Sequence, residues 1–288
     1  MTHTPNYGQS VKSRLLNLAK KENIRYQQLV TRYFQERLLF RLSQSEYRDH
    51  FVLKGGTLLY AYDHFAARPT LDIDFMGDKI DNDVESIKDA FSSICSIPYE
   101  TDGVNFLSDT LKAETITVEK EYPGIRISLV ATLDSIRQTI SMDIGFGDIV
   151  IPEPEELDYP ILLADFPSTN IMAYSLETVV AEKFQTMIER TTFNSRMKDF
   201  FDVYRICTTQ TLDATLLQEA IHATFENRGT TYSEDHILFS DKFATDSDLN
   251  LRWNAFLKKI KYEPGIPFAD VMEQIQKWLK PYWENLKA

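Results

Sequence analysis

Apolar residues recur every three or four positions over long stretches of the chain, which is the spacing of amphipathic helices. Residues 10–48 carry two such stripes in succession, so we predict two helices there. Thr57, directly after Gly55-Gly56, opens a third helix that runs to about Phe65. The same spacing predicts further helices over residues 83–95, 175–190, 196–207, 213–226, 247–261 and 268–286.

Polar and apolar residues alternate in the middle of the chain, which is typical of half-buried strands. Residues 70–76, between Pro69 and Gly77, form the clearest case. Three more strands are expected over residues 113–118, 125–133 and 139–145, the first two joined by a turn holding Tyr122-Pro123-Gly124.

A stretch rich in Pro and Glu, residues 151–160, reads as a connector before a helical second half. We therefore expect an α+β fold with a mixed sheet, flanking helices and a helical C-terminal domain. The expected boundary puts residues 1–160 in the first domain and residues 161–288 in the second.

Composition narrows the class of protein. The 288 residues include only 10 Gly and 11 Pro, together about 7% of the chain, against roughly 12% in typical globular chains. This shortage of turn residues argues against a turn-rich all-β fold. The net charge of −12 argues against a general nucleic-acid coat protein. Residues 1–54 nevertheless carry ten Lys and Arg against four Asp and Glu. That basic segment is either a solvated helix face or a local contact for a polyanion.

The polar N-terminal decapeptide does not resemble a signal peptide, and no apolar run reaches the roughly 20 residues that span a bilayer. We therefore expect a cytoplasmic protein without a membrane partner. The two cysteines, Cys95 and Cys207, form no CxxC pair, so neither a disulfide framework nor a cysteine metal site is expected.

Asp72 and Asp74 are the strongest candidates for a chemical role in this sequence. Residues i and i+2 of a strand project from one face, so the two carboxylates repel each other unless a cation lies between them. Such oxygen donors suit Mg²⁺, which takes the rest of its ligands from water and substrate phosphates. The alternative is a solvated strand whose polar face happens to be acidic.

Three further elements can complete that site. Gly55, Gly56 and Thr57 at a helix start can form an anion site from backbone N–H groups and a hydroxyl. Arg68 can neutralise a phosphate or pair with Asp72. Asp143 lies on the polar face of the 139–145 strand and is the candidate third carboxylate.

The run LKGGTLLYAYDHFAARPTLDIDF resembles the AbiEii/MenT nucleotidyltransferase toxins, a branch of the DNA-polymerase-β-like nucleotidyltransferases. The shared signature is Gly-Gly-Ser/Thr followed by Asp-x-Asp. Four later segments are also similar to that branch: the helix with Ala181-Glu182-Lys183, the helix with Arg196-Met197-Lys198-Asp199 and Asp202, and the stretches 220–230 and 252–259.

The resemblance implies an enzyme that transfers an NMP from an NTP to a hydroxyl, with Mg²⁺ as cofactor. Asp72, Asp74 and Asp143 would hold the metal, and Gly55, Gly56, Thr57, Arg68 and Lys183 would hold the triphosphate. Asp199 and Asp202 share a helix face and would order Lys183, Arg196 or the nucleotide itself.

The family resemblance also implies a toxin of a toxin–antitoxin pair that modifies tRNA 3′ ends, with a cognate antitoxin as partner. The basic N-terminal helices are the candidate tRNA contact. Two alternatives remain open: a nucleotidyltransferase with a small-molecule acceptor, and a nucleotide-binding interaction protein without turnover.

Overall fold

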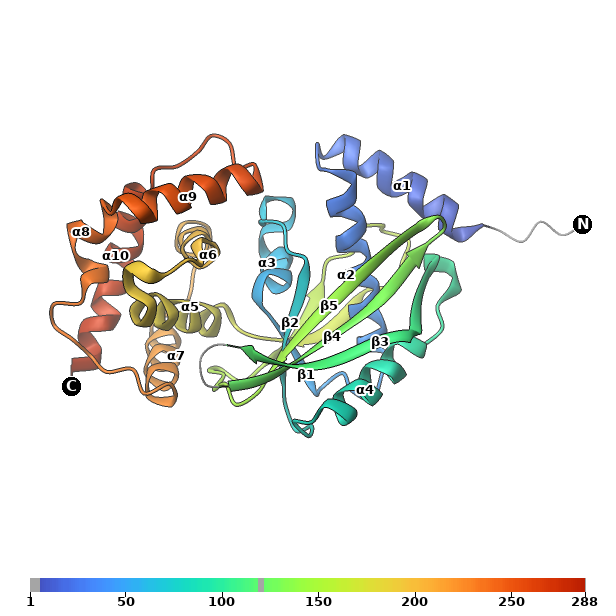
Figure 1. Cartoon of the computed structure of the whole chain (residues 1–288), viewed down its shortest axis with the longest axis horizontal. Helices are drawn as coiled ribbons and strands as arrows, with labels where there is room; N and C mark the ends of the chain where they lie inside the picture. The colour runs from blue at the N-terminus through green and yellow to red at the C-terminus, as the bar shows by residue number, and fades with distance from the viewer. Residues whose placement is uncertain (1–5, 119–121, 288) are drawn as a thin grey trace, which may run out of the picture. The chain divides into compact units, whose positions relative to one another are not determined.

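The computed structural model describes residues 6–118 and 122–287 (Figure 1). Its contacts divide the chain into two compact units. The first contains residues 1–147 and 155–173, and the second contains residues 148–154 and 174–288. The expected boundary at residue 160 falls inside the 155–173 segment, which returns to the first unit.

The first unit is built on a mixed sheet of seven strands in the order β3-β4-β5-β2-β1-β7-β6. Its long strands β3, β4 and β5 run side by side in Figure 1, and β5 then pairs in parallel with β2. The strands are β1 (Phe51–Lys54), β2 (Asp72–Gly77), β3 (Val104–Val118), β4 (Tyr122–Leu133), β5 (Ile136–Gly145), β6 (Glu155–Tyr159) and β7 (Thr169–Ala173).

Helices α2 (Tyr26–Ser43) and α4 (Val84–Ser96) pack on the sheet and on each other. The alternation in β2 sends Ile73 and Phe75 toward this core, where the Phe75 ring lies 5.9 Å from that of Phe51 and 6.2 Å from that of Phe91. Helix α1 (Tyr7–Lys21) packs on α2, and the short α3 (Gly55–Asp63) packs on β1 and β2. One face of each central strand is thus apolar and buried, which leaves the other for polar side chains.

The second unit is helical. Ser175 caps α5 by accepting a hydrogen bond from the Thr178 backbone N–H at 3.1 Å, as expected for an N-cap. Aromatic side chains, among them the fully buried Trp253 and Trp283, fill the core between the helices. The helices are α5 (Leu176–Arg190), α6 (Met197–Thr209), α7 (Ala214–Asn227), α8 (Asp241–Ala244), α9 (Ser247–Ile260) and α10 (Phe268–Glu284).

The predicted α+β class is confirmed, and the structure corrects several details. Strands β1, β6 and β7 were not predicted, because runs of four or five residues are too short to show a clear period. Helix α3 begins at Gly55 rather than after the glycines. The predicted turn at Tyr122-Pro123-Gly124 lies within β4, and the residues before it, 119–121, lie outside the described residues.

No helix in the described part of the chain combines the length and the apolar character needed to cross a bilayer.

Candidate active site

Asp72 and Asp74 lie on the polar face of β2, and both are half-buried. The residues between and after them, Ile73 and Phe75, are 0% and 1% exposed on the opposite face. Strand alternation therefore holds the two carboxylates side by side, as the sequence predicts. Two half-buried negative charges at this spacing favour a cation between them.

A row of charged residues crosses the sheet at the level of Asp74. In strand register, Glu114 is opposite Arg126, Arg126 is opposite Asp143, Asp143 is opposite Asp74, and Asp74 is opposite Lys54. Directly opposed residues project from the same face. These residues lie on the adjacent strands β3, β4, β5, β2 and β1, of which the first three are seen side by side in Figure 1. Two carboxylates, Asp143 and Asp74, therefore lie between two cationic positions.

Asp143 is not an open ligand in this structure. Arg126 donates two hydrogen bonds to it, from Nε to Oδ1 and from Nη2 to Oδ2, each 2.7 Å long. These bonds are the main cause of the raised pKa of Arg126, to which the charge of Asp72 also contributes. Across residues 6–118 and 122–287, no three His, Cys, Asp or Glu side chains are arranged so that they could hold a metal ion. The predicted three-carboxylate site is therefore not assembled while Arg126 pairs with Asp143.

Gly55 is required by its neighbour Asp74, and Gly56 leaves little room for a side chain. Gly55 has a φ of +69°, and a Cβ there would lie 2.0 Å from Asp74 Oδ2. A Cβ on Gly56 would lie 3.2 Å from both terminal nitrogens of Arg68. The absent side chains let the start of α3 approach Asp74 and Arg68 closely. The structure thus brings the Gly-Gly pair, Asp74 and Arg68 together.

Thr57 has a different role from the predicted one. Its side chain is 1% exposed, and its hydroxyl donates to the backbone oxygen of Asp72 at 3.1 Å. Tyr159 in turn donates to the backbone oxygen of Thr57 at 3.2 Å. The Thr57 hydroxyl therefore ties α3 to β2 instead of facing a ligand.

Lys183, Asp199 and Asp202 form a buried cluster in the second unit. Lys183 Nζ lies 2.8 Å from Asp199 Oδ1 and 2.8 Å from Asp202 Oδ2, and Arg196 Nε lies 2.6 Å from Asp199 Oδ2. Burial opposes ionisation of Asp199, but Lys183 and Arg196 outweigh it and lower the pKa of that carboxyl to about 2. The two aspartates therefore hold the Lys183 ammonium in place, which is one of the roles that their spacing predicts.

Arg228 supports the helix that carries Lys183, and sequence reasoning did not single it out. Its guanidinium donates to Gln185 Oε1 at 3.0 Å and to Asp148 Oδ1 at 3.1 Å, and it lies 3.7 Å from Glu182 Oε1. Two of these partners flank Lys183 on α5. Arg228 thereby holds the middle of α5, around Lys183, from a position distant in sequence.

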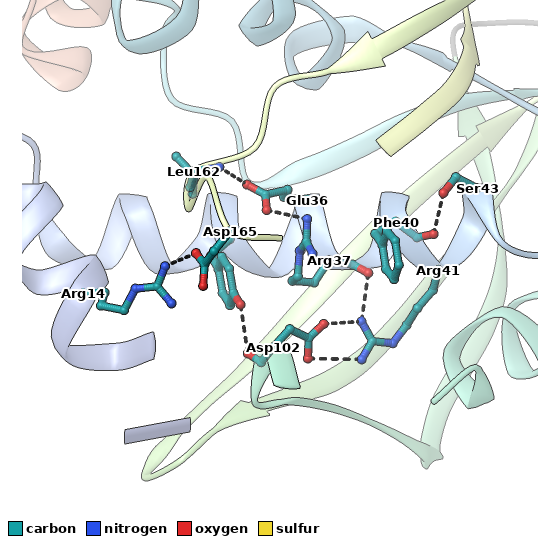
Figure 2. A network of polar contacts seen from close by, with 10 residues as sticks. Arg14, Glu36, Arg37, Phe40, Arg41, Ser43, Asp102, Leu162 and Asp165 are labelled. Atoms are coloured by element: carbon teal, nitrogen blue, oxygen red, sulfur yellow. Dashed lines mark hydrogen bonds and ion pairs between the residues drawn. The ribbon is translucent and has the colours of Figure 1, made fainter. Parts of the chain in front are cut away.

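Several arginines of the basic N-terminal segment form ion pairs within the first unit. This weakens the predicted role of the segment as a polyanion contact. Arg37 is fully buried beside Glu36, and Arg41 is bound to Asp102 at 2.8 Å (Figure 2). Arg14 pairs with Asp165 in the same view. Three cations of the segment stay exposed near the turn between α1 and α2: Lys20, Lys21 and Arg25.

Comparison with known proteins agrees with this fold. Two crystal structures from Helicobacter pylori have the same overall fold. One, of a candidate nucleotidyltransferase, aligns with a TM-score of 0.53 at 15% identity over 92% of this chain and 98% of its own. The other, JHP933, aligns with a TM-score of 0.51 at 14% identity over 91% and 94%. This chain therefore shares its overall fold with both structures.

The family is defined by sequence. The model of the AbiEii nucleotidyltransferase toxins of type IV toxin–antitoxin systems matches residues 37–278, and the chain belongs to this family. It is therefore a nucleotidyltransferase. No protein of curated function matches the chain at a significant level.

Proposed function

We propose that this enzyme transfers an NMP from an NTP to a hydroxyl at the 3′ end of tRNA, with Mg²⁺ as cofactor. The observation that carries the proposal is the close approach of the Gly55 backbone to the Asp74 carboxylate, with Asp72 alongside on the same strand face. This arrangement puts a carboxylate pair next to the start of a helix, where backbone N–H groups favour phosphate.

The residues present fit a Mg²⁺ ion through Asp72 and Asp74. Both are hard oxygen donors, and Mg²⁺ is commonly held by one or two carboxylates together with substrate phosphates. Bound Mg²⁺ supplies charge neutralisation at the phosphates and the leaving pyrophosphate. Asp143 can join these ligands, or accept the proton of the attacking hydroxyl, once Arg126 has left it.

The remaining groups bind and orient the substrate. The Gly55-Gly56-Thr57 backbone at the start of α3 and the Arg68 guanidinium beside Gly56 are proposed to bind the triphosphate. Lys183, held by Asp199 and Asp202, is proposed as a further triphosphate contact, and the two aspartates as nucleotide-ordering groups. Positioning and charge neutralisation account for most of the rate enhancement in such transfers.

The direct test is label transfer. The protein is incubated with Mg²⁺, total tRNA and each of the four α-labelled NTPs in turn. We expect label on tRNA with the wild type, and none with Asp74→Ala. Asp109→Ala, which removes an exposed carboxylate from β3 of the same sheet, is the matched control and should retain activity. Equal transfer by wild type and Asp74→Ala would contradict the proposed site.

A small-molecule acceptor is the second candidate, and one observation favours it. Because Arg14, Arg37 and Arg41 are engaged within the first unit, few cations of the N-terminal segment remain to bind a polyanion. Label that appears on a small acceptor without tRNA would identify this alternative. Tight NTP binding without pyrophosphate release would instead indicate a binding protein without turnover.

The type IV toxin–antitoxin family implies a partner antitoxin. We propose that expression of this chain arrests growth and that co-expression of a cognate antitoxin relieves the arrest. Asp74→Ala should be harmless when it is expressed alone.

A further inference from the structure

The charged row across the sheet contains a feature that the transfer reaction does not require. Asp143 is placed where a third metal-binding carboxylate is expected, yet it is already paired with a cation of the chain itself, Arg126. Arg126 binds both carboxylate oxygens in a bidentate pair, the strongest geometry between these two groups.

The strand pairing brings Arg126 and Asp143 together, and the ion pair that they form is accessible to solvent. Arg126 and Asp143 are directly opposed on the neighbouring strands β4 and β5, so no rearrangement of the backbone is needed to form it. The Arg126 side chain is 40% exposed and that of Asp143 is 18% exposed. Solvent and ions can therefore reach the guanidinium, which distinguishes this pair from the closed Arg41–Asp102 pair, at 3% and 0%.

Asp143 also lies beside the carboxylates that would hold a metal. It is opposite Asp74 in the parallel pairing of β2 and β5, and the charge of Asp72 contributes to the raised pKa of Arg126. A divalent ion that used all three carboxylates would have to compete with the guanidinium for Asp143. Because Arg126 already donates to both oxygens of Asp143, an ion that binds there shares those oxygens with the guanidinium, and each cation weakens the binding of the other.

We propose that Arg126 is a positioning residue that competes with a divalent cation for Asp143. In its paired state the site binds one ion, on Asp72 and Asp74, and Arg126 takes the place of a second. Asp143 becomes a metal ligand only when Arg126 leaves it. This inference rests on the proposed metal site of Asp72 and Asp74.

The test counts metal ions in the purified full-length protein without substrate. Mn²⁺ is titrated into the protein, and the bound fraction is read by electron paramagnetic resonance and by calorimetry. We expect one site in the wild type. Arg126→Gln is expected to show a second site, or to bind that second ion about 10- to 100-fold more tightly than the wild type, because the competing charge-assisted pair is gone.

Three further variants separate the possible causes. In Arg126→Gln/Asp143→Asn the second site should disappear, since its ligand has been removed. Arg137→Gln removes an exposed arginine from the same face of β5, six residues and about 20 Å from Asp143, and should bind Mn²⁺ like the wild type. Arg126→Lys keeps the charge without the bidentate pair, so its affinity for the second ion should fall between those of the wild type and Arg126→Gln.

The outcomes are decisive. A second Mn²⁺ ion bound as tightly in the wild type as in Arg126→Gln, or a single ion in a folded Arg126→Gln protein, would overturn the competition. If Arg137→Gln raised the affinity for the second Mn²⁺ ion as much as Arg126→Gln does, the proposal would also be overturned. The loss of one positive charge anywhere on the sheet would then explain the effect. If Asp74→Asn binds Mn²⁺ as the wild type does, the proposed metal site itself fails, which is a separate result.

Discussion

Replacing Gly55 with alanine tests the contact on which the site depends. The new Cβ would lie 2.0 Å from Oδ2, 2.7 Å from Cγ and 2.9 Å from Cβ of Asp74. Since real Cβ atoms do not approach heavy atoms this closely, the Asp74 side chain or the start of α3 must move. The backbone adds a second penalty, because the φ of +69° lies in the left-handed region that disfavours L side chains.

Both penalties can be estimated. The left-handed conformation costs about 1–2 kcal/mol for alanine. Forcing extra volume into a packed position costs about 1–3 kcal/mol more. Gly55→Ala should therefore lower the free energy of unfolding of the first unit by roughly 2–5 kcal/mol. It should also weaken Mn²⁺ binding, because the displaced carboxylate is a proposed ligand.

Two other glycines separate the penalties. Gly229 has a φ of +61° with no heavy atom within 4 Å of its virtual Cβ, so Gly229→Ala carries the conformational cost alone. Gly145 lies in the same unit as Gly55, has no left-handed φ, and its nearest contact is Phe75 O at 4.0 Å, so Gly145→Ala carries neither cost. Hydrogen exchange along a urea series reads the stability of each unit separately. If Gly55→Ala costs no more than Gly229→Ala, the close contact with Asp74 does not exist.

The remaining predictions concern buried groups. Lys183→Met removes the buried cation that Asp199 and Asp202 share and should destabilise the second unit by about 3–5 kcal/mol in urea titrations, whereas Met at the exposed Lys277 should be nearly neutral. Burial raises the pKa of Glu36 from 4.5 to about 7, despite the adjacent arginine. Because the folded state keeps this proton longer, stability should fall between pH 4.5 and 7 by on the order of 3 kcal/mol; Glu36→Gln should flatten that slope, and an unchanged slope would assign it to other groups. Tyr159→Phe removes one buried hydrogen bond to the Thr57 backbone and should lower the thermal midpoint by an amount equivalent to about 1 kcal/mol.

Local patterns were sufficient to predict the elements that carry the site. The alternation around Asp72 and Asp74 placed both carboxylates on one face of a strand, and the same reasoning put Asp143 on the polar face of another. These features depend on residues two positions apart, so a single sequence shows them.

The register of pairing between strands could not be predicted in this way. Arg126 meets Asp143 across an interval of 17 residues, and Lys54 is opposite Asp74 through a strand of only four residues. Register depends on the packing of whole strands and on the turns between them, which one sequence does not reveal. The row of charges is consequently a property of the sheet, and Arg126 carried no local signal that distinguished it from other arginines.

The path of the chain between its two units has a practical consequence. The backbone passes from one unit to the other after residue 147, returns after residue 154, and crosses again after residue 173. A single cut anywhere from 148 to 173 therefore leaves part of one unit attached to the wrong fragment. Separate expression of either half would need a rearranged gene, in which residues 148–154 are supplied to the helical half and 155–173 to the sheet.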